Sequence, residues 1–322
     1  MTSAEVDGPT PRSGLADDGP LLTAVLIGVG VLGVSLAAPI GAAAAAPALA
    51  IAFWRTAAAT VAGVAFTALL PSARAELRNP SWRAALPHSV VAGLWLALHF
   101  ALWMPSLKLT SVAAATALVC ATPVWVVAWD LVRGRPVPAK VLVGVSVAMA
   151  GVLVITGVDA ASSPQALLGD LMALGGGIAA AGYVLAGASA RRQISTNAYT
   201  LVAYSVCAVM LGGLCLVTGT AVVGFSALTW VQLGVLTVAA QLLGHSVLNR
   251  TLRSAGSTTV SLAILLEVPG AALVAWVWLG HVPPIALLPG ALLLLAGLVL
   301  VILRGRSVPD EARESNVTPA RR

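Results

Sequence analysis

Charged side chains are scarce in this chain of 322 residues. Asp, Glu, Lys and Arg make up 9% of it, whereas a soluble domain carries about 25%. Hydrophobic residues account for 59%, and the mean hydropathy is +0.95. Because so few charges cannot cover a water-soluble surface, the composition excludes a soluble protein and predicts an integral membrane protein with several spans.

Cysteine is also rare, and it lacks the spacing of a metal site. The three cysteines, Cys120, Cys207 and Cys215, all lie inside apolar runs, and no Cys-x-x-Cys or paired Cys/His spacing occurs. This pattern argues against a zinc site or a disulfide framework. We therefore predict neither a metal nor any other cofactor.

Motifs of ATP hydrolysis, of metalloproteases and of serine hydrolases are absent as well. The chain contains no Gly-x-x-x-x-Gly-Lys-Ser/Thr, His-Glu-x-x-His or Gly-x-Ser-x-Gly. Gly28, Gly30 and Gly33 match the spacing of a dinucleotide-binding loop, but they lie in an apolar run with no strand before them and no acidic partner after them. We predict that the protein is not an enzyme and that any transport is driven by gradients.

Ten apolar segments follow one another along the chain, each close to the roughly 20 residues that cross a bilayer. They lie at about 21–39, 48–70, 86–107, 111–131, 140–158, 167–188, 197–218, 228–249, 257–280 and 284–303. In lipid an open sheet would leave backbone groups unpaired, so long apolar runs must be helices. The predicted fold class is an all-α integral membrane protein with ten transmembrane helices.

The basic residues follow the topology of such a protein and do not form a nucleic-acid-binding face. The net charge of +6 comes from short clusters in every second connection and after the last segment. Lys108 is the exception. By the positive-inside rule both termini lie in the cytoplasm, in a protein of the cytoplasmic membrane. Residues 1–20 are polar and predict a disordered cytoplasmic tail, and residues 304–322 form a second cytoplasmic tail.

The chain matches itself after a shift of 146 residues. The matching pairs are His99/His245, Ser111/Ser257, Pro123/Pro269, Gly134/Gly280, Pro138/Pro284, Gly144/Gly290 and Gly151/Gly297. The predicted units are a first five-helix repeat at 21–158 and a second at 167–303. Because five spans is an odd number, the second unit must sit upside down, as in the inverted repeats of secondary transporters.

Several motifs resemble the EamA-type transporters of the drug/metabolite transporter superfamily. They are Gly93–Trp103, Thr110–Thr116 with Pro123, Gly169-Asp170, Asn249-Arg250 and Leu266-Glu267-Val268-Pro269. The resemblance spans about residues 21–303. It implies ten helices in two inverted repeats, a cavity lined by helices 1, 3, 4, 6, 8 and 9, and export or exchange of small metabolites. Gly134-Arg135 and Gly280-His281 depart from the Gly-Glu that the family commonly has there.

Glu267 is the single acidic residue in the middle of the ninth segment. A charge at that depth costs about 2.5–3.5 kcal/mol, so the side chain should face the interior of the bundle. It could bind a substrate ammonium group or exchange protons, or it could be a structural acid beside Pro269. Pro123 and Pro269 each remove a backbone hydrogen bond, which makes them candidate hinges or static kinks.

Other polar residues within the segments are candidates for contact with a substrate or an ion. His99 and His245 are related by the repeat, and Trp103 lies one helical turn beyond His99. Arg55 could bind an anion, pair with Glu267 or extend to the interface. Tyr183, Gln241 and Asn249 offer hydrogen bonds, although Asn249 could instead cap its helix.

These features predict a secondary transporter that exports a small metabolite, such as an amino acid, by alternating access. Protons are a candidate coupling ion, and the lipid bilayer is the surrounding partner. The alternative is a membrane scaffold or sensor that transports nothing. The sequence leaves open the substrate, the coupling ion, the direction of net transport and whether the chain forms a homodimer.

Overall fold

The computed structural model describes residues 20–78, 80–244, 247, 260 and 263–304. In these residues the secondary structure is helical throughout, with no strand. The elements are α1 (Pro20–Ser35), α2 (Ala37–Ala43), α3 (Ala48–Leu69), α4 (Pro71–Arg78), η1 (Pro80–Ala85), α5 (Leu86–Ser106), α6 (Val112–Val119), α7 (Thr122–Val132), α8 (Ala139–Ser162), α9 (Pro164–Ala190), α10 (Thr196–Val217), α11 (Ala227–Val235), the π-helix η2 (Leu236–Gly244), α13 (Glu267–Leu279), η3 (Ile285–Leu287) and α14 (Leu288–Arg304). The all-α prediction is confirmed for this part of the chain.

Nine helical segments in the described ranges are long and apolar enough to cross a membrane. They are Leu21–Ala43, Ala48–Leu69, Trp82–Ser106, Val112–Val132, Ala139–Ser162, Pro164–Ala190, Thr196–Val217, Ala227–Gly244 and Ile285–Leu303. They coincide with nine of the ten expected segments. Where a segment at 257–280 was expected, there is a shorter apolar helix, Ala263–Leu279. Most of 257–262 and both expected tails, apart from residues 20 and 304, lie outside the described residues, so a tenth span stays a prediction.

The helices bury small side chains and expose large apolar ones. Alanine dominates the interior, while Leu216, Val217 and Ile285 are more than 80% exposed. In a bilayer, helices attract one another mainly through close packing, which small residues permit. This distribution is that of a helix bundle whose outer surface contacts lipid.

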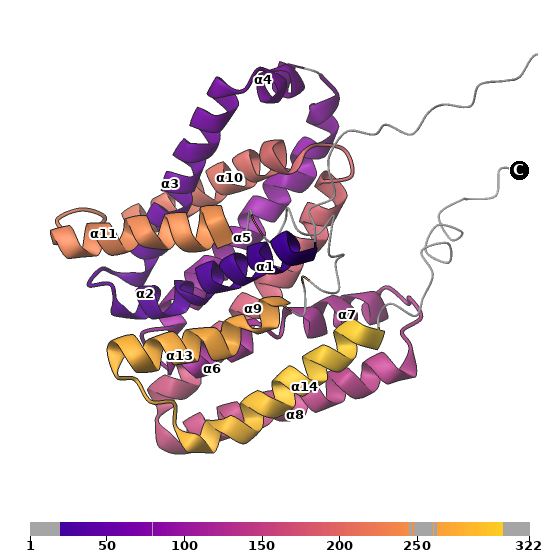
Figure 1. Cartoon of the computed structure of the whole chain (residues 1–322), viewed down its shortest axis with the longest axis vertical. Helices are drawn as coiled ribbons and strands as arrows, with labels where there is room; N and C mark the ends of the chain where they lie inside the picture. Colours follow the sequence, from indigo (N-terminus) through magenta and orange to yellow (C-terminus); the bar gives the residue numbers. More distant parts are fainter. Residues whose placement is uncertain (1–19, 79, 245–246, 248–259, 261–262, 305–322) are drawn as a thin grey trace, which may run out of the picture.

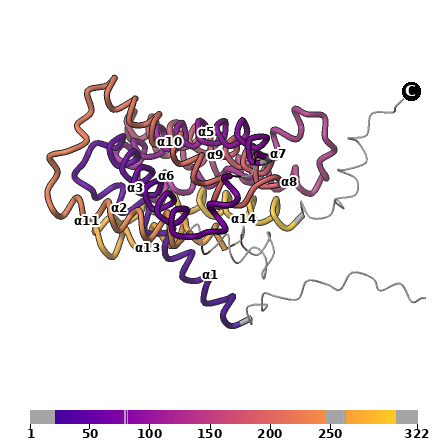
Figure 2. Tube along the Cα trace, turned by 90° about the horizontal axis from the view of Figure 1, so that it is seen from above, coloured from indigo at the N-terminus to yellow at the C-terminus, as the bar shows by residue number. Residues whose placement is uncertain are grey.

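Long-range packing joins helices that are distant in sequence. α5 lies along α9, α8 lies along α14, and α10 contacts both α3 and α5 (Figure 1). Seen from above, α5, α9 and α10 occupy one side and α13 and α14 the other, with α6 between them (Figure 2). A shift of five spans, forward from α5 and α6 and backward from α9 and α10, relates three contacts to three others. The contacts α5·α9, α6·α9 and α5·α10 correspond to η2·α1, α13·α1 and α3·η2.

Glycines form the contact between α8 and α14. A Cβ atom added at Gly144 would lie 2.9 Å from the carbonyl oxygen of Gly297, and one added at Gly151 would lie 2.6 Å from that of Gly290. The contacts are reciprocal, since a Cβ at Gly297 or Gly290 would meet the carbonyl oxygens of Gly144 and Gly151 at 2.6 and 3.0 Å. Residue numbers rise along one helix as they fall along the other, so α8 and α14 are antiparallel.

Residues separated by 146 positions also have matching backbone conformations. Gly134 ends α7 with a φ of 67°, and Gly280 ends α13 with a φ of 68°. Pro138 and Pro284 precede the next helices with φ/ψ of −58°/137° and −55°/128°. Only glycine adopts the positive φ of such a helix end without strain.

The fourth span is broken before its proline. α6 ends at Val119, four residues before Pro123. Proline has no N–H to donate to the carbonyl group of Val119, and the proline ring crowds that group. The freed carbonyl oxygen of Val119 instead accepts a hydrogen bond of 2.9 Å from the hydroxyl group of Thr122. In the later unit the helical residues 263–265 end four residues before Pro269. The predicted helix disturbance is therefore observed at both prolines.

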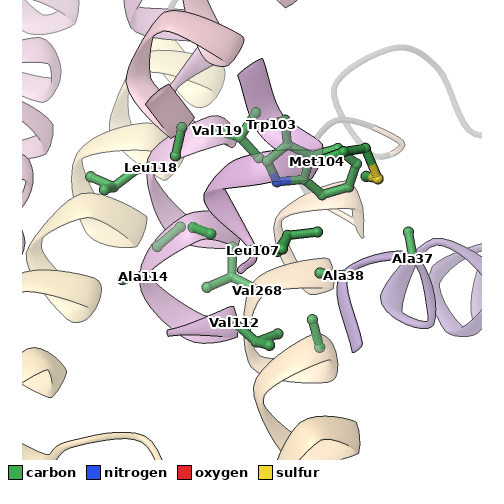
Figure 3. Close-up of a cluster of buried hydrophobic side chains, with 14 of the residues drawn as sticks. Ala37, Ala38, Trp103, Met104, Leu107, Val112, Ala114, Leu118, Val119 and Val268 are labelled. Atoms are coloured by element: carbon green, nitrogen blue, oxygen red, sulfur yellow. The ribbon is translucent and has the colours of Figure 1, made fainter. Parts of the chain in front are cut away.

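The end of α5 is held in an apolar cluster with α6 and α13. Trp103, Met104 and Leu107 pack near Val112 of α6 and Val268 of α13 (Figure 3). Val268 directly follows Glu267, so this packing fixes the beginning of α13 next to the aromatic end of α5.

Candidate functional site

A fully buried arginine lies inside the bundle. Arg55 of α3 is 1% exposed, and its Nη2 donates a hydrogen bond of 2.7 Å to Oε1 of Gln241 in η2. Its guanidinium lies 4.3 Å from the ring centre of Phe100 in α5. Nε and Nη1 have no hydrogen-bond partner. The interpretation that Arg55 extends to the membrane interface is wrong, because Gln241 and Phe100 hold it inside.

Glu267 lies near this arginine without pairing with it. It is the first residue of α13, immediately after the interruption at Leu266, and it is partly buried. Arg55 and Glu267 interact electrostatically. In the described part of the chain the ion pair within 4.0 Å is Arg135–Asp130, so Arg55 and Glu267 lie farther apart than that. The predicted direct pairing of these two side chains is therefore not observed.

Aromatic side chains of α5 form one wall of the site. The rings of His99 and Trp103 are stacked with centres 5.5 Å apart, and His99 lies 4.7 Å from Phe100. Nδ1 of His99 lies 2.9 Å from the carbonyl oxygen of Gly176 in α9. Because a carbonyl oxygen can only accept, Nδ1 carries the hydrogen and Nε2 of a neutral ring is left as an acceptor. Trp103 is 4% exposed, and its Nε1 has no partner.

Two further members of the site were missed by the sequence reasoning. Tyr204 of α10 interacts with both Gln241 and Arg55, and Phe100 covers the guanidinium. Tyr204 is a polar side chain inside an apolar run and could have been found by the criterion that selected Tyr183. Phe100 gives no such signal, since an apolar residue in an apolar helix is unremarkable.

The remaining candidates lie elsewhere or cannot be placed. Tyr183 stacks against Tyr199 at 6.0 Å, and the guanidinium of Arg191 lies 5.8 Å from the ring of Tyr199. Tyr183 thus belongs to a second aromatic group toward an arginine-bearing end. His245 and Asn249 fall outside the described residues. The proposed roles of all these side chains, and of Pro123 and Pro269 as hinges, stay predictions.

Comparison with known proteins identifies this helical bundle. Residues 167–303 match the model of the EamA-like transporter family. An uncharacterised transporter of Archaeoglobus fulgidus is 28% identical over 227 residues, which cover 70% of this chain and 78% of the relative. These matches support an EamA-type transporter, by the similarity of residues 167–303 to that family and of the chain to this relative. A crystal structure that is 18% identical covers 89% of this chain and 99% of its own, with a TM-score of 0.59, and likeness at that identity supports the fold alone.

The family match and the nine apolar helices of the described residues support a multi-pass membrane transporter, which implies a small-molecule substrate and a lipid surround. The family points to transport rather than to catalysis. The site around Arg55 is then a set of polar side chains at the centre of a transporter, contributed by α3, α5, α10, η2 and α13.

The transporter also has a cavity of about 390 Å³ at the end of the bundle opposite the arginine-bearing connections. Its lining includes Lys108, Thr110, Ser111, Ala275, His281 and Pro283. Nζ of Lys108 donates hydrogen bonds of 2.7 and 2.8 Å to the carbonyl oxygens of Ala42 and Ala44 at the end of α2. Burial lowers the pKa of Lys108 from its ordinary value.

Proposed function

We propose that this chain is a secondary carrier that exports a small zwitterionic metabolite, such as an amino acid, across the cytoplasmic membrane by alternating access. The observation that carries the proposal is the buried guanidinium of Arg55. Two of its nitrogens have no partner, and the nearby carboxyl group of Glu267 is not paired with it.

Arg55 fits the carboxylate group of such a substrate. A charged side chain within a membrane costs about 2.5–3.5 kcal/mol, and an unsatisfied buried donor costs about 1–3 kcal/mol more. A carboxylate could accept two parallel hydrogen bonds from one guanidinium. Gln241 and Phe100 fix the orientation of the group and leave Nε and Nη1 for a ligand.

Glu267 fits the ammonium group of the same substrate. Opposite charges in a low-dielectric interior attract strongly and would pair directly if nothing held them apart. Here α3 and α13 keep them more than 4.0 Å apart, which suits a ligand with a positive and a negative group. Trp103 and His99 then contact the apolar part of the ligand.

Alternating access would follow from an inverted five-plus-five repeat, with units at 21–158 and 167–303. Two supports are the reciprocal contacts between α8 and α14 and the matching helix ends at Gly134 and Gly280. Reciprocal contacts between two antiparallel helices are what a two-fold axis between inverted units would produce, so they support the proposed repeat. In such carriers the substrate binds near the midplane between the repeats, and the interruptions before Pro123 and Pro269 would allow bending.

A flux experiment with purified protein in liposomes tests this function. Labelled amino acids are added outside liposomes that are loaded with the same unlabelled compound, with and without a pH gradient. We expect counterflow of at least one zwitterion, and no counterflow of its methyl ester or of the corresponding amine, because both lack the carboxylate. If no compound of a broad amino-acid panel exchanges, the proposed function is wrong.

Proton exchange at Glu267 is a separate part of the proposal. Glu267→Gln keeps the size and shape of the side chain, removes its charge and replaces one acceptor oxygen with an NH2 donor. We expect the variant to lose the dependence of flux on the pH gradient. Unchanged pH dependence in a variant that still transports would exclude Glu267 as the coupling group.

A further inference from the structure

A second set of buried charges lies away from Arg55, at the end of the bundle where α8 meets α9. Asp159 is in the last turn of α8 and Asp170 is in the second turn of α9. Asp159 is 7% exposed and Asp170 is fully buried. Both lie opposite the arginine-bearing connections, close to the 390 Å³ cavity.

Both acids lie beside the connection between α5 and α6. The hydroxyl group of Thr110 in that connection donates a hydrogen bond of 2.9 Å to Oδ2 of Asp159. The Asp170 side chain interacts with Asp159 and lies near Thr110. Neither carboxyl oxygen of Asp170 accepts a hydrogen bond of ordinary length and angle. Asp170 is thus a fully buried polar side chain without a hydrogen-bond partner.

No cation in the described residues pairs with these acids. The connection beside them carries Lys108, but its ammonium group is bound to the carbonyl groups of Ala42 and Ala44. The neighbouring connection between α13 and η3 carries His281, which is exposed and lines the cavity. Ser111 caps the beginning of α6, and its hydroxyl oxygen accepts a hydrogen bond from the backbone N–H of Ala114.

We propose that Asp159 and Asp170 bind one proton between them and form a proton site of the carrier, separate from the Arg55 cluster. Two ionised carboxylates cannot lie side by side in a poorly solvated place without a counter-ion, and such pairs retain a proton. With the proton bound, the O–H of one carboxyl group can donate a hydrogen bond to the carboxylate oxygen of the other.

A proton fits the site better than a metal ion does. Calcium takes six to eight oxygen ligands and magnesium about six, whereas this site offers two carboxyl groups and one hydroxyl group. No group of three or more His, Cys, Asp or Glu side chains in the described ranges could hold a metal ion.

Thr110 links the acid pair to the cavity. It lines the cavity, donates to Asp159 and lies against Gly169, where an added Cβ atom would be 2.9 Å from its backbone nitrogen. Gain or loss of the proton changes the charge that Thr110 faces and so the position of its connection at the cavity. The link between this proton and flux rests on the proposed function; the proton site itself does not.

Infrared difference spectroscopy of the protein in liposomes tests the proton site directly. During a pH titration we expect the wild type to show a carbonyl band of a protonated carboxylic acid. A component of the band should be lost in Asp170→Asn and in Asp159→Asn and should persist in the matched variant Glu267→Gln. Thr110→Val should shift the titration midpoint. A wild type without the band, or with a band lost only in Glu267→Gln, would overturn the proposal, as would loss of the band on addition of sodium ions at constant pH.

Flux measurements separate this inference from the proposed function. We expect Asp170→Asn to keep counterflow at equal pH on both sides and to lose the acceleration by a pH gradient. If counterflow is absent in the wild type as well, the proposed function fails while the spectroscopic result stands. If Asp170→Asn still responds to the gradient as the wild type does, the pair does not couple protons to flux.

Discussion

A guanidinium carries five N–H donors, and at Arg55 one of them has an acceptor, on Gln241. The ring of Phe100 offers a cation–π contact on one face. A residue that served only to join α3 to η2 would need no permanent charge in this place. A substrate carboxylate would supply the missing acceptors.

We therefore predict that replacement of Arg55 lowers the affinity for the substrate. A hydrogen bond to a charged group contributes about 1.5–3 kcal/mol, or about tenfold to a hundredfold in affinity. We expect Arg55→Gln to raise the KM for counterflow by at least that factor and Arg55→Lys to restore part of it, since lysine keeps the charge but not the two-pronged geometry. The exposed Arg74→Gln is the matched control. Equal KM values for Arg55→Gln and the wild type would contradict the assignment.

At the same scale, the sequence indicates the polar residues of the candidate site better than its purely apolar ones. Arg55, Glu267 and Gln241 stand out because polar groups in apolar runs are costly. Phe100 does not stand out, and neither does the unmet hydrogen-bonding capacity of Arg55, because both depend on packing between α3, α5 and η2. The partnership of Asp159 with Asp170 likewise depends on how two consecutive helices fold back on each other.

The contact between α8 and α14 allows a sharp prediction for an element. In Gly151→Ala the new methyl group would lie 2.6 Å from the carbonyl oxygen of Gly290, so the backbones must separate. Overpacking of this kind costs about 1–3 kcal/mol. We expect a lower melting temperature in detergent or lipid. Gly157→Ala on the same helix is the control, because nothing lies within 4 Å of its added Cβ atom; equal destabilisation by both would refute the close contact.

The interrupted fourth span gives a second prediction at this scale. Pro123→Ala restores an N–H that can donate to the Val119 carbonyl group, so a continuous helix becomes possible. If bending at this point accompanies transport, we expect slower counterflow with little change in substrate binding or melting temperature. Pro136→Ala, in an exposed connection, is the control. A Pro123→Ala variant that transports at the wild-type rate would make the interruption a static packing feature.

For elements, the sequence predicted position better than detail. Nine apolar runs coincide with helices to within a few residues, because length and hydrophobicity alone decide what spans a bilayer. The π-helical turn of η2 and the interruption at Leu36 between α1 and α2 were not predicted. Both are local changes of helix type within continuous apolar runs, which the apolar pattern does not reveal.

For the whole molecule, the contact between α8 and α14 constrains the topology. The reciprocal glycine contacts require α8 and α14 to cross the membrane in opposite directions. These helices follow the connections 133–138 and 280–284, which must then lie on opposite sides. The arginine residues are placed accordingly, with Arg133 and Arg135 in the first connection and none in the second.

Accessibility of single introduced cysteines tests this topology. Ala75 is exposed on α4 on the arginine-bearing side, and Ala221 is exposed in the connection between α10 and α11 on the other side, so each is replaced by cysteine in turn. By the positive-inside rule we expect a membrane-impermeant maleimide to label Ala221→Cys in intact cells and Ala75→Cys only after permeabilisation. The unsubstituted protein reports background, which should be low because Cys207 and Cys215 are buried and Cys120 is partly buried. The reverse labelling pattern would mean that the protein has the opposite orientation in the membrane. The Asp159/Asp170 pair would then lie on the cytoplasmic side, and the pair would take up its proton from that side.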